Sequence, residues 1–130
     1  MSSISEILKD AEKDIKSILA FKNHNYLRYF MNCAYIPAHK LNLPFGPVPF
    51  SLNPGQDQYT PAGFWNFAKK ISTFERKDIK ALRLETLFIQ ALETVSAEES
   101  AIIVAMKDQT LHTLFPSITY ETLKTVGYFQ

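Results

Sequence analysis

Residues 60–106 are TPAGFWNFAKKISTFERKDIKALRLETLFIQALETVSAEESAIIVAM, and they predict three successive helices. Thr60 and Pro61 match a helix N-cap followed by proline at the first helical position. Ser96 and Glu99 match a capping box at the start of the last of the three. Between these signals, apolar residues recur at the spacing of a helix. They are Phe64, Phe67, Ala68 and Ile71, and after Asp78 they are Ile79, Leu82, Phe88, Ile89 and Leu92.

The same stretch contains the densest group of basic residues in the chain. These residues are Lys69, Lys70, Arg76, Lys77, Lys80 and Arg83. The only acidic residues of this stretch up to residue 85 are Glu75, Asp78 and Glu85. The net charge of the whole chain is +1, but its middle is basic and its C-terminal part is acidic. Such a distribution can present one basic face to a partner. The alternative is a solvated surface whose charges cancel at long range.

Composition is typical of a soluble globular protein. The chain has 130 residues, of which 46% are hydrophobic and 21% charged, enough for one domain with a substantial core. Its single cysteine, Cys33, excludes an internal disulfide and agrees with a reducing compartment. No N-terminal leader and no apolar run near the roughly 20 residues of a membrane span are present. We therefore expect a cytoplasmic protein with no membrane partner.

Further helices are expected on both sides of this stretch. Residues 3–20 show the clearest amphipathic pattern, with Ser3 and Glu6 as a second capping box, and they predict one long helix. A second helix is expected to end near Tyr35. Near the C-terminus, Thr119 can cap a short helix that Gly127 ends.

Residues 36–59 predict a long loop, because prolines and glycines are frequent there. Six apolar residues favour a loop anchored on the helices, with short extended pieces near residues 45–52. These six are Leu41, Leu43, Phe45, Val48, Phe50 and Leu52. An aromatic-lined groove for a peptide or for nucleic-acid bases is the functional alternative. The expected fold is therefore all-α, a single compact domain (residues 1–130) of about six helices with one long proline-rich loop.

Patterns of catalysis and metal binding are missing from the sequence. The four glycines are scattered, so they form no phosphate-binding loop. The three histidines stand apart, and no His or Cys pair has the spacing of metal ligands. Cys33 lies beside an apolar helical stripe and is expected to be a small buried hydrophobe. We therefore expect a protein that is not an enzyme and that uses no cofactor and no metal.

The order of segments nevertheless has a recognisable pattern. An apolar capped helix is followed by a helix ending in tyrosine before a proline-containing loop, then by an aromatic helix, a basic turn and a long apolar helix. The segments that carry the pattern are Ile4-Ser5-Glu6-Ile7-Leu8, Tyr26-Leu27-Arg28-Tyr29-Phe30, Ala34-Tyr35 before Pro37, Phe64-Trp65-Asn66-Phe67, Phe74-Glu75-Arg76-Lys77, residues 78–94 and Ala105-Met106-Lys107-Asp108. In this order they resemble the N-terminal α-helical DNA-binding domain of T-even-type phage ATP-dependent DNA ligases, and small phage proteins that carry this domain alone.

This resemblance implies a non-catalytic module that binds double-stranded DNA, since the Lys-x-Asp-Gly motif needed for ligation is absent. The six basic residues would contact phosphates, with Lys107, His112 and Lys124 as further candidates. One departure is that the ligase domains have a glycine-containing loop after the aspartate, where this chain has Asp108-Gln109-Thr110. Without glycine, a close approach of the backbone to DNA is harder. The alternative is therefore a phage accessory protein that binds a host or phage protein and no longer binds DNA.

Overall fold

The structure is a computed structural model that describes residues 3–43, 46 and 61–129. Its described residues are helical, with turns between the helices and no strand among them, so the predicted all-α fold is confirmed. The α-helices are α1 (Ile4–Lys13), α2 (Asn25–Tyr35), α3 (Pro61–Ala68), α4 (Ala81–Leu92), α5 (Ala97–Lys107), α6 (Leu111–Leu114) and α7 (Tyr120–Thr125). The 3-10 helices are η1 (Ile15–Phe21), η2 (Pro37–His39) and η4 (Ile71–Glu75). No described helix has the length and apolar character needed to cross a bilayer.

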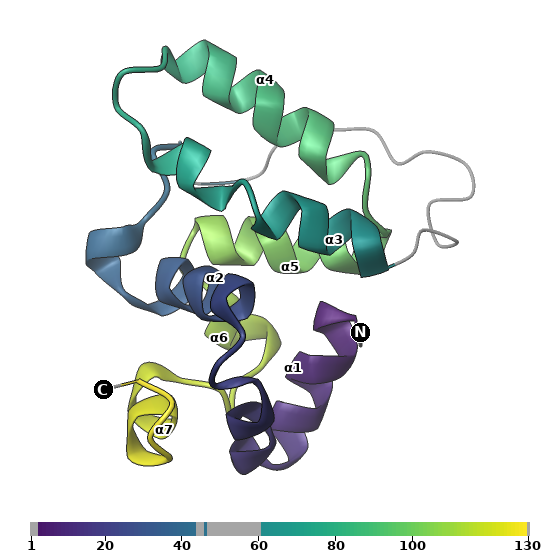
Figure 1. Cartoon of the computed structure of the whole chain (residues 1–130), viewed down its shortest axis with the longest axis vertical. Helices are drawn as coiled ribbons and strands as arrows, with labels where there is room; N and C mark the ends of the chain where they lie inside the picture. The colour runs from purple at the N-terminus through teal and green to yellow at the C-terminus, as the bar shows by residue number, and fades with distance from the viewer. Residues whose placement is uncertain (1–2, 44–45, 47–60, 130) are drawn as a thin grey trace.

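The helices are arranged along one long axis, which is vertical in Figure 1. Helix α4 lies at one end, and η1 and α7 lie at the other. Helix α5 runs through the middle, where it contacts α1, α2 and α6, while α2 also contacts α3. The two ends of the molecule therefore present different helices to solvent.

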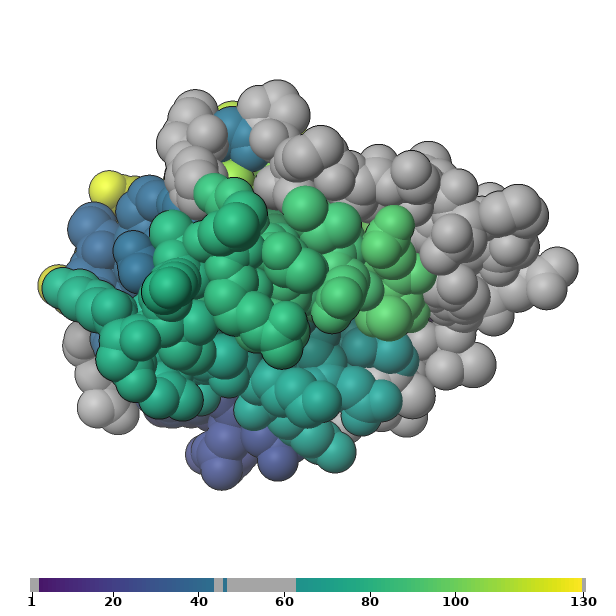
Figure 2. All heavy atoms as spheres, turned by 90° about the horizontal axis from the view of Figure 1, so that it is seen from above, coloured from purple at the N-terminus to yellow at the C-terminus, as the bar shows by residue number. Residues whose placement is uncertain are grey.

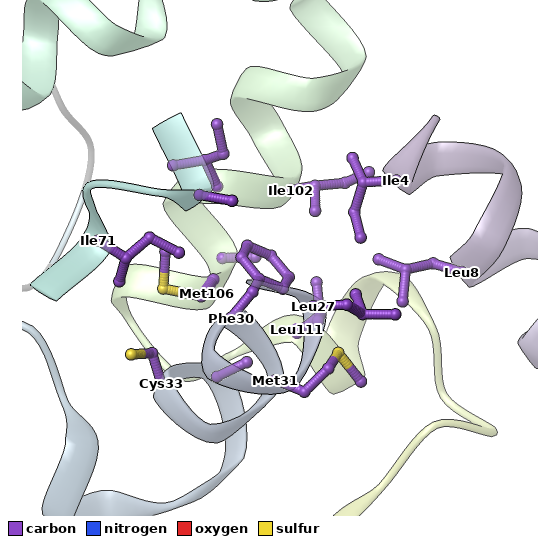
Figure 3. Close-up of a cluster of buried hydrophobic side chains, with 14 of the residues drawn as sticks. Ile4, Leu8, Leu27, Phe30, Met31, Cys33, Ile71, Ile102, Met106 and Leu111 are labelled. Atoms are coloured by element: carbon purple, nitrogen blue, oxygen red, sulfur yellow. The ribbon is translucent and has the colours of Figure 1, made fainter. Parts of the chain in front are cut away.

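The core forms where α1, α2, α3 and α5 meet. Figure 3 shows Phe30 of α2 inside a cluster to which α1 contributes Ile4 and Leu8 and α5 contributes Ile102 and Met106. Each of these side chains is at most 2% exposed. Burial of large apolar side chains is the main favourable term in folding. Helix α5, which is buried over most of its length, therefore lies at the centre of the fold.

The helix expected over residues 3–20 is two elements instead of one. Asp14 has an extended backbone conformation, with φ of −146° and ψ of 102°, which ends α1. Its carboxylate then accepts a hydrogen bond from the Lys16 amide at 3.1 Å, so Asp14 caps η1. Because the break changes the direction of the stripe, Ile18 is buried while Leu19 is 36% exposed. The competing preference of aspartate for caps explains the break.

Most of the capping signals are confirmed. Ser96 and Glu99 form both hydrogen bonds of a capping box at the start of α5. Thr119 caps α7, and Gly127 after this helix has a left-handed conformation with φ of +91°. Pro61 begins α3 as expected, whereas the predicted N-cap Thr60 lies outside the described residues.

The start of the proline-rich segment is anchored as predicted. Leu41 and Leu43 are buried, and the Asn42 amide between them donates to the Phe74 carbonyl oxygen at 2.7 Å. This contact holds the segment after η2 against η4. The predicted anchors Phe45, Val48, Phe50 and Leu52, the extended pieces near them and the alternative of an aromatic groove lie outside the described residues.

Glu99 is a buried carboxyl group. Its side chain accepts hydrogen bonds through Oε1 from the Ser96 hydroxyl (3.0 Å) and the Ser96 amide (3.4 Å). Its Oε2 atom is buried and has no hydrogen-bond partner among the described residues. Burial raises the pKa of Glu99, although the hydrogen bonds from Ser96 act in the opposite direction. Folding therefore makes this carboxyl group easier to protonate than it is in the unfolded chain.

We expect Glu99→Gln to raise the thermal unfolding midpoint at pH 7 relative to the native chain. Folding raises the pKa of this carboxyl group, so its contribution to the stability of the folded protein is fully present at pH values below its unfolded pKa, about 4.3. This contribution is lost as the pH rises through the folded pKa. Glutamine keeps an acceptor for Ser96 but carries no charge. The advantage of the variant should therefore shrink as pH falls toward 4. Thermal melts across this range, with the exposed Glu121→Gln as control, test it, and a constant difference would contradict it.

Candidate nucleic-acid interface

The six basic residues of the central stretch lie on one continuous segment that runs from the end of α3 into the first turn of α4. We call residues 69–83 the basic segment. All six basic side chains in it are exposed. In Figure 1 the segment leaves the end of α3, passes through η4 and enters α4 at one end of the molecule, and Figure 2 looks onto that end. The segment therefore runs from the end of α3 to the end of the molecule where α4 lies, with its six basic side chains exposed along the way.

Apolar residues within and beside the basic segment explain why the charges point outward. Ile71 and Phe74 of η4 are buried, as are Leu84 and Phe88 of α4. The rings of Phe74 and Phe88 pack edge to face, with centroids 5.5 Å apart. The basic residues between these anchors are left on the solvent side.

Glu75, one of the two acids in the basic segment, is engaged by residues on the inner side. The Tyr29 hydroxyl donates to its Oε2 atom, and the Cys33 Sγ and His39 Nδ1 atoms lie 3.7 and 3.5 Å from its Oε1 atom. Burial, and after it the hydrogen bond to Glu75, raises the pKa of Tyr29. The Glu75 carboxylate thus contacts side chains of α2 and η2 and does not pair with the exposed lysines of the segment.

Cys33 is fully buried, as predicted. Burial raises the pKa of its thiol, and the negative charge of Glu75 raises it further. A thiol held in its protonated form is a poor nucleophile, because the thiolate is the reactive species. Among the described residues, no group of three or more His, Cys, Asp or Glu side chains is placed to hold a metal ion.

Asp78, the second acid of the basic segment, pairs with Arg76. Two hydrogen bonds join them, Nε to Oδ1 at 2.9 Å and Nη2 to Oδ2 at 2.5 Å. The hydrogen bonds from Arg76 lower the pKa of Asp78. The Lys69 ammonium lies 5.8 Å from the centre of the Tyr26 ring, a cation–π geometry. Four basic residues of the segment remain. Within the part of the chain that the structure describes, they form no ion pair, and they are Lys70, Lys77, Lys80 and Arg83.

The three further candidates do not join this surface. Lys107 is 1% exposed, its ammonium pairs with the Asp108 carboxylate at 2.8 Å, and it donates to the Gly46 carbonyl oxygen at 2.8 Å. A buried ammonium cannot reach a phosphate on the surface, so the expectation for Lys107 is wrong. His112 and Lys124 are exposed, but α6 and α7 carry them in the half of the molecule opposite α4.

The first turn of α4 has a feature that the periodicity did not predict. Leu82 was expected in the apolar stripe, yet it is 75% exposed. The sequence contains a signal for this, because Leu84, Phe88 and Leu92 recur every four residues and define the buried face. Leu82 lies two residues before that series and therefore points away from it. Lys80, at the N-cap position, makes no side-chain cap, so the first amide groups of α4 add to the positive potential.

A groove of about 370 Å³ lies beside the basic segment, between α3, η4 and α4. Its lining includes the apolar side chains of Phe67, Phe74 and Leu87 and the polar side chains of Lys70 and Gln90. Gly63 permits the close packing at this groove, since a Cβ atom there would lie 2.8 Å from the Thr94 carbonyl oxygen. The groove thus connects an apolar surface to the basic segment.

The turn after α5 forms without the glycine of the ligase domains. Gln109 takes the left-handed conformation itself, with φ of +57°. Its side-chain amide donates to the carbonyl oxygens of Cys33 (3.1 Å) and Ile36 (2.8 Å) at the end of α2. These hydrogen bonds satisfy carbonyl groups that the helix end leaves open and hold the unusual conformation. Gln109 thus ties the turn to α2, a role that glycine could not perform.

Comparison with known proteins gave no match, whether with protein-family models, with curated proteins or with solved structures. The resemblance to the phage ligase domain therefore remains a prediction from the sequence pattern.

Proposed function

We propose that this chain is a non-catalytic module that binds double-stranded DNA by contacting phosphates through the basic segment. The observation that supports this most is the state of the two acids in that segment. Glu75 is held by Tyr29 and His39 from the inside, and Asp78 is paired with Arg76. The remaining exposed ammonium and guanidinium groups are therefore available to an external polyanion.

The proposed contacts are with the DNA backbone, so they carry little sequence information. Lys70, Lys77, Lys80 and Arg83 would bind phosphates, and Lys69 beside Tyr26 would contribute at the edge of the surface. Such binding releases counterions, so the affinity falls steeply as salt is added. The similarity of the segment order to the ligase DNA-binding domain supports the same function.

Replacing Lys77, Lys80 and Arg83 together by alanine is expected to weaken duplex binding at least tenfold at low salt, as an order of magnitude. The plot of log affinity against log salt should also become shallower, by about 0.9 for each lost phosphate contact. Fluorescence anisotropy of a labelled duplex across a salt series measures both quantities. The three side chains are exposed, so the fold should tolerate the change.

The matched control removes the same charge from the other end of the molecule. Lys13, Lys16 and Lys124 are exposed and lie away from α4. Their joint replacement by alanine should leave the affinity and the salt slope close to those of the native chain. Equal losses in the two triple variants would point to a nonspecific charge effect and reject the basic segment as the interface. Absence of duplex binding at low salt would reject the function itself.

The second candidate is recognition of a host or phage protein. It is favoured by the groove between α3, η4 and α4, whose apolar side chains Phe67, Phe74 and Leu87 could receive a partner's side chain. Gln90→Arg would obstruct this groove without touching the core, since Gln90 is exposed. A protein partner that binds the native chain in stoichiometric amounts and not this variant, in the absence of duplex binding, would support the second candidate.

A further inference from the structure

The groove between α3, η4 and α4 has a single charged side chain in its described lining. Of the ten described residues around it, only Lys70 carries a charge, and the others are apolar or neutral. Lys70 is exposed, and within the part of the chain that the structure describes it forms no ion pair. The groove therefore has a positive charge that no described lining residue neutralises.

The acidic residues closest in sequence to this lining do not change that balance. Glu75 follows the lining residue Phe74, but its carboxylate contacts Tyr29 and His39 on the inner side of η4. Glu93 precedes the lining residue Thr94 and is not itself part of the lining. Among the described residues, a negative charge inside the groove would therefore have to come from a ligand.

The rest of the groove is largely apolar. Phe67 of α3 and Phe74 of η4 are at most 5% exposed, and their ring centroids lie 5.8 Å apart. Leu87 and Ala91 of α4 are half-buried beside them. The volume of about 370 Å³ falls within the roughly 300–1,000 Å³ of small-molecule sites in proteins. A ligand therefore gains most in this groove if it combines an apolar body with one negative charge.

We propose that this groove binds a small amphipathic carboxylate of the fatty-acid class. Its apolar chain lies against Phe67 and Leu87, and its carboxylate pairs with the Lys70 ammonium. The exposed amides of Asn66 and Gln90, which also line the groove, offer hydrogen-bond donors to the same carboxylate. This site is independent of DNA binding, although Lys70 is also one of the proposed phosphate contacts.

Octanoate titrated into the native chain by isothermal titration calorimetry tests the site, and three matched probes separate the two parts of the ligand. Octanol has the same apolar chain without the charge and should bind about fivefold more weakly, the effect of one exposed ion pair. Acetate keeps the carboxylate without the apolar chain, so its affinity should be lower on the order of tenfold or more. Octylammonium carries the opposite charge and should bind more weakly than octanol.

Variants of the chain locate the site. Lys70→Ala should lower the affinity for octanoate about fivefold and leave that for octanol unchanged, whereas Lys70→Arg should keep the native affinity for both. Lys69→Ala is the matched control, because Lys69 is the adjacent exposed lysine and does not line the groove. Ala91→Leu fills part of the groove and should weaken octanoate and octanol alike, with circular dichroism to verify that this variant is folded.

The outcomes separate this site from the DNA-binding function. Absence of octanoate binding, equal affinities for octanoate and octanol, equal losses in Lys70→Ala and Lys69→Ala, or native binding by folded Ala91→Leu would each overturn the proposal. Tighter binding of a short peptide with a free C-terminal leucine would assign the groove to a protein C-terminus and also overturn it. Because these titrations contain no DNA, each of these results leaves the proposed function standing. Absence of duplex binding at low salt would in turn leave the carboxylate site standing.

Discussion

Replacing Lys107 by alanine is expected to lower the free energy of unfolding by about 3–5 kcal/mol, the usual cost of breaking a buried ion pair from one side. The Lys107 ammonium is held between the Asp108 carboxylate and the Gly46 carbonyl oxygen, at 2.8 Å from each. The Gly46 amide in turn donates to the Asp108 carboxylate at 3.1 Å. Alanine would leave a carboxylate that is 10% exposed without its cation, and it would release Gly46 from α5. Urea unfolding followed by the fluorescence of Trp65 measures this loss.

The control is another lysine in the same half of the sequence. Lys124→Ala removes an exposed side chain, so its effect should stay within about 0.5 kcal/mol. Asp108→Ala and the double variant complete a cycle, and the double variant should lose less than the two single losses added together. If Lys107→Ala proved as mild as Lys124→Ala, the buried pair would not be a determinant of stability.

Capping signals in the sequence correctly predicted the starts of helices whose caps are formed by residues close in sequence. The capping box at Ser96 and the cap at Thr119 are satisfied by residues three positions away, so a short window contains all that is needed. Asp14 shows the limit of this reasoning. The apolar stripe of the sequence continues past Asp14. Its carboxylate nevertheless caps a new helix, because aspartate is more favourable at an N-cap than in a helix interior.

Features that depend on distant residues could not be predicted in this way. Lys107 looks like any lysine near the end of a helix, and its hydrogen bond to the Gly46 carbonyl oxygen joins it to a residue 61 positions earlier. The role of Glu75 likewise depends on Tyr29 and His39, which reach it only after α2 and η2 have packed. The charge of the basic segment could be counted from the sequence, whereas the contacts that engage Glu75 required the tertiary structure.

Replacing Phe64 by alanine is expected to cost about 3–5 kcal/mol in the free energy of unfolding. Phe64 is fully buried on α3, and its ring meets that of Phe30 on α2 edge to face, with centroids 5.3 Å apart. It also contacts the ring of Trp65 at 4.9 Å, so its loss removes packing on two sides. Alanine leaves a cavity that the helices can close in part, and Phe64→Leu should cost less because it keeps most of the volume. Urea unfolding of the two variants measures the difference.

The same variant connects the core to the proposed interface. Helix α3 leads directly into the basic segment, so a looser α3 should also disorder the phosphate contacts. Under conditions where Phe64→Ala is still folded, the duplex affinity should fall, and the slope of log affinity against log salt should become shallower. Tyr26→Ala, which removes a 43% exposed aromatic ring, should cost little stability. Native duplex affinity in folded Phe64→Ala would show that the basic segment keeps its arrangement without the packing of α3 against α2.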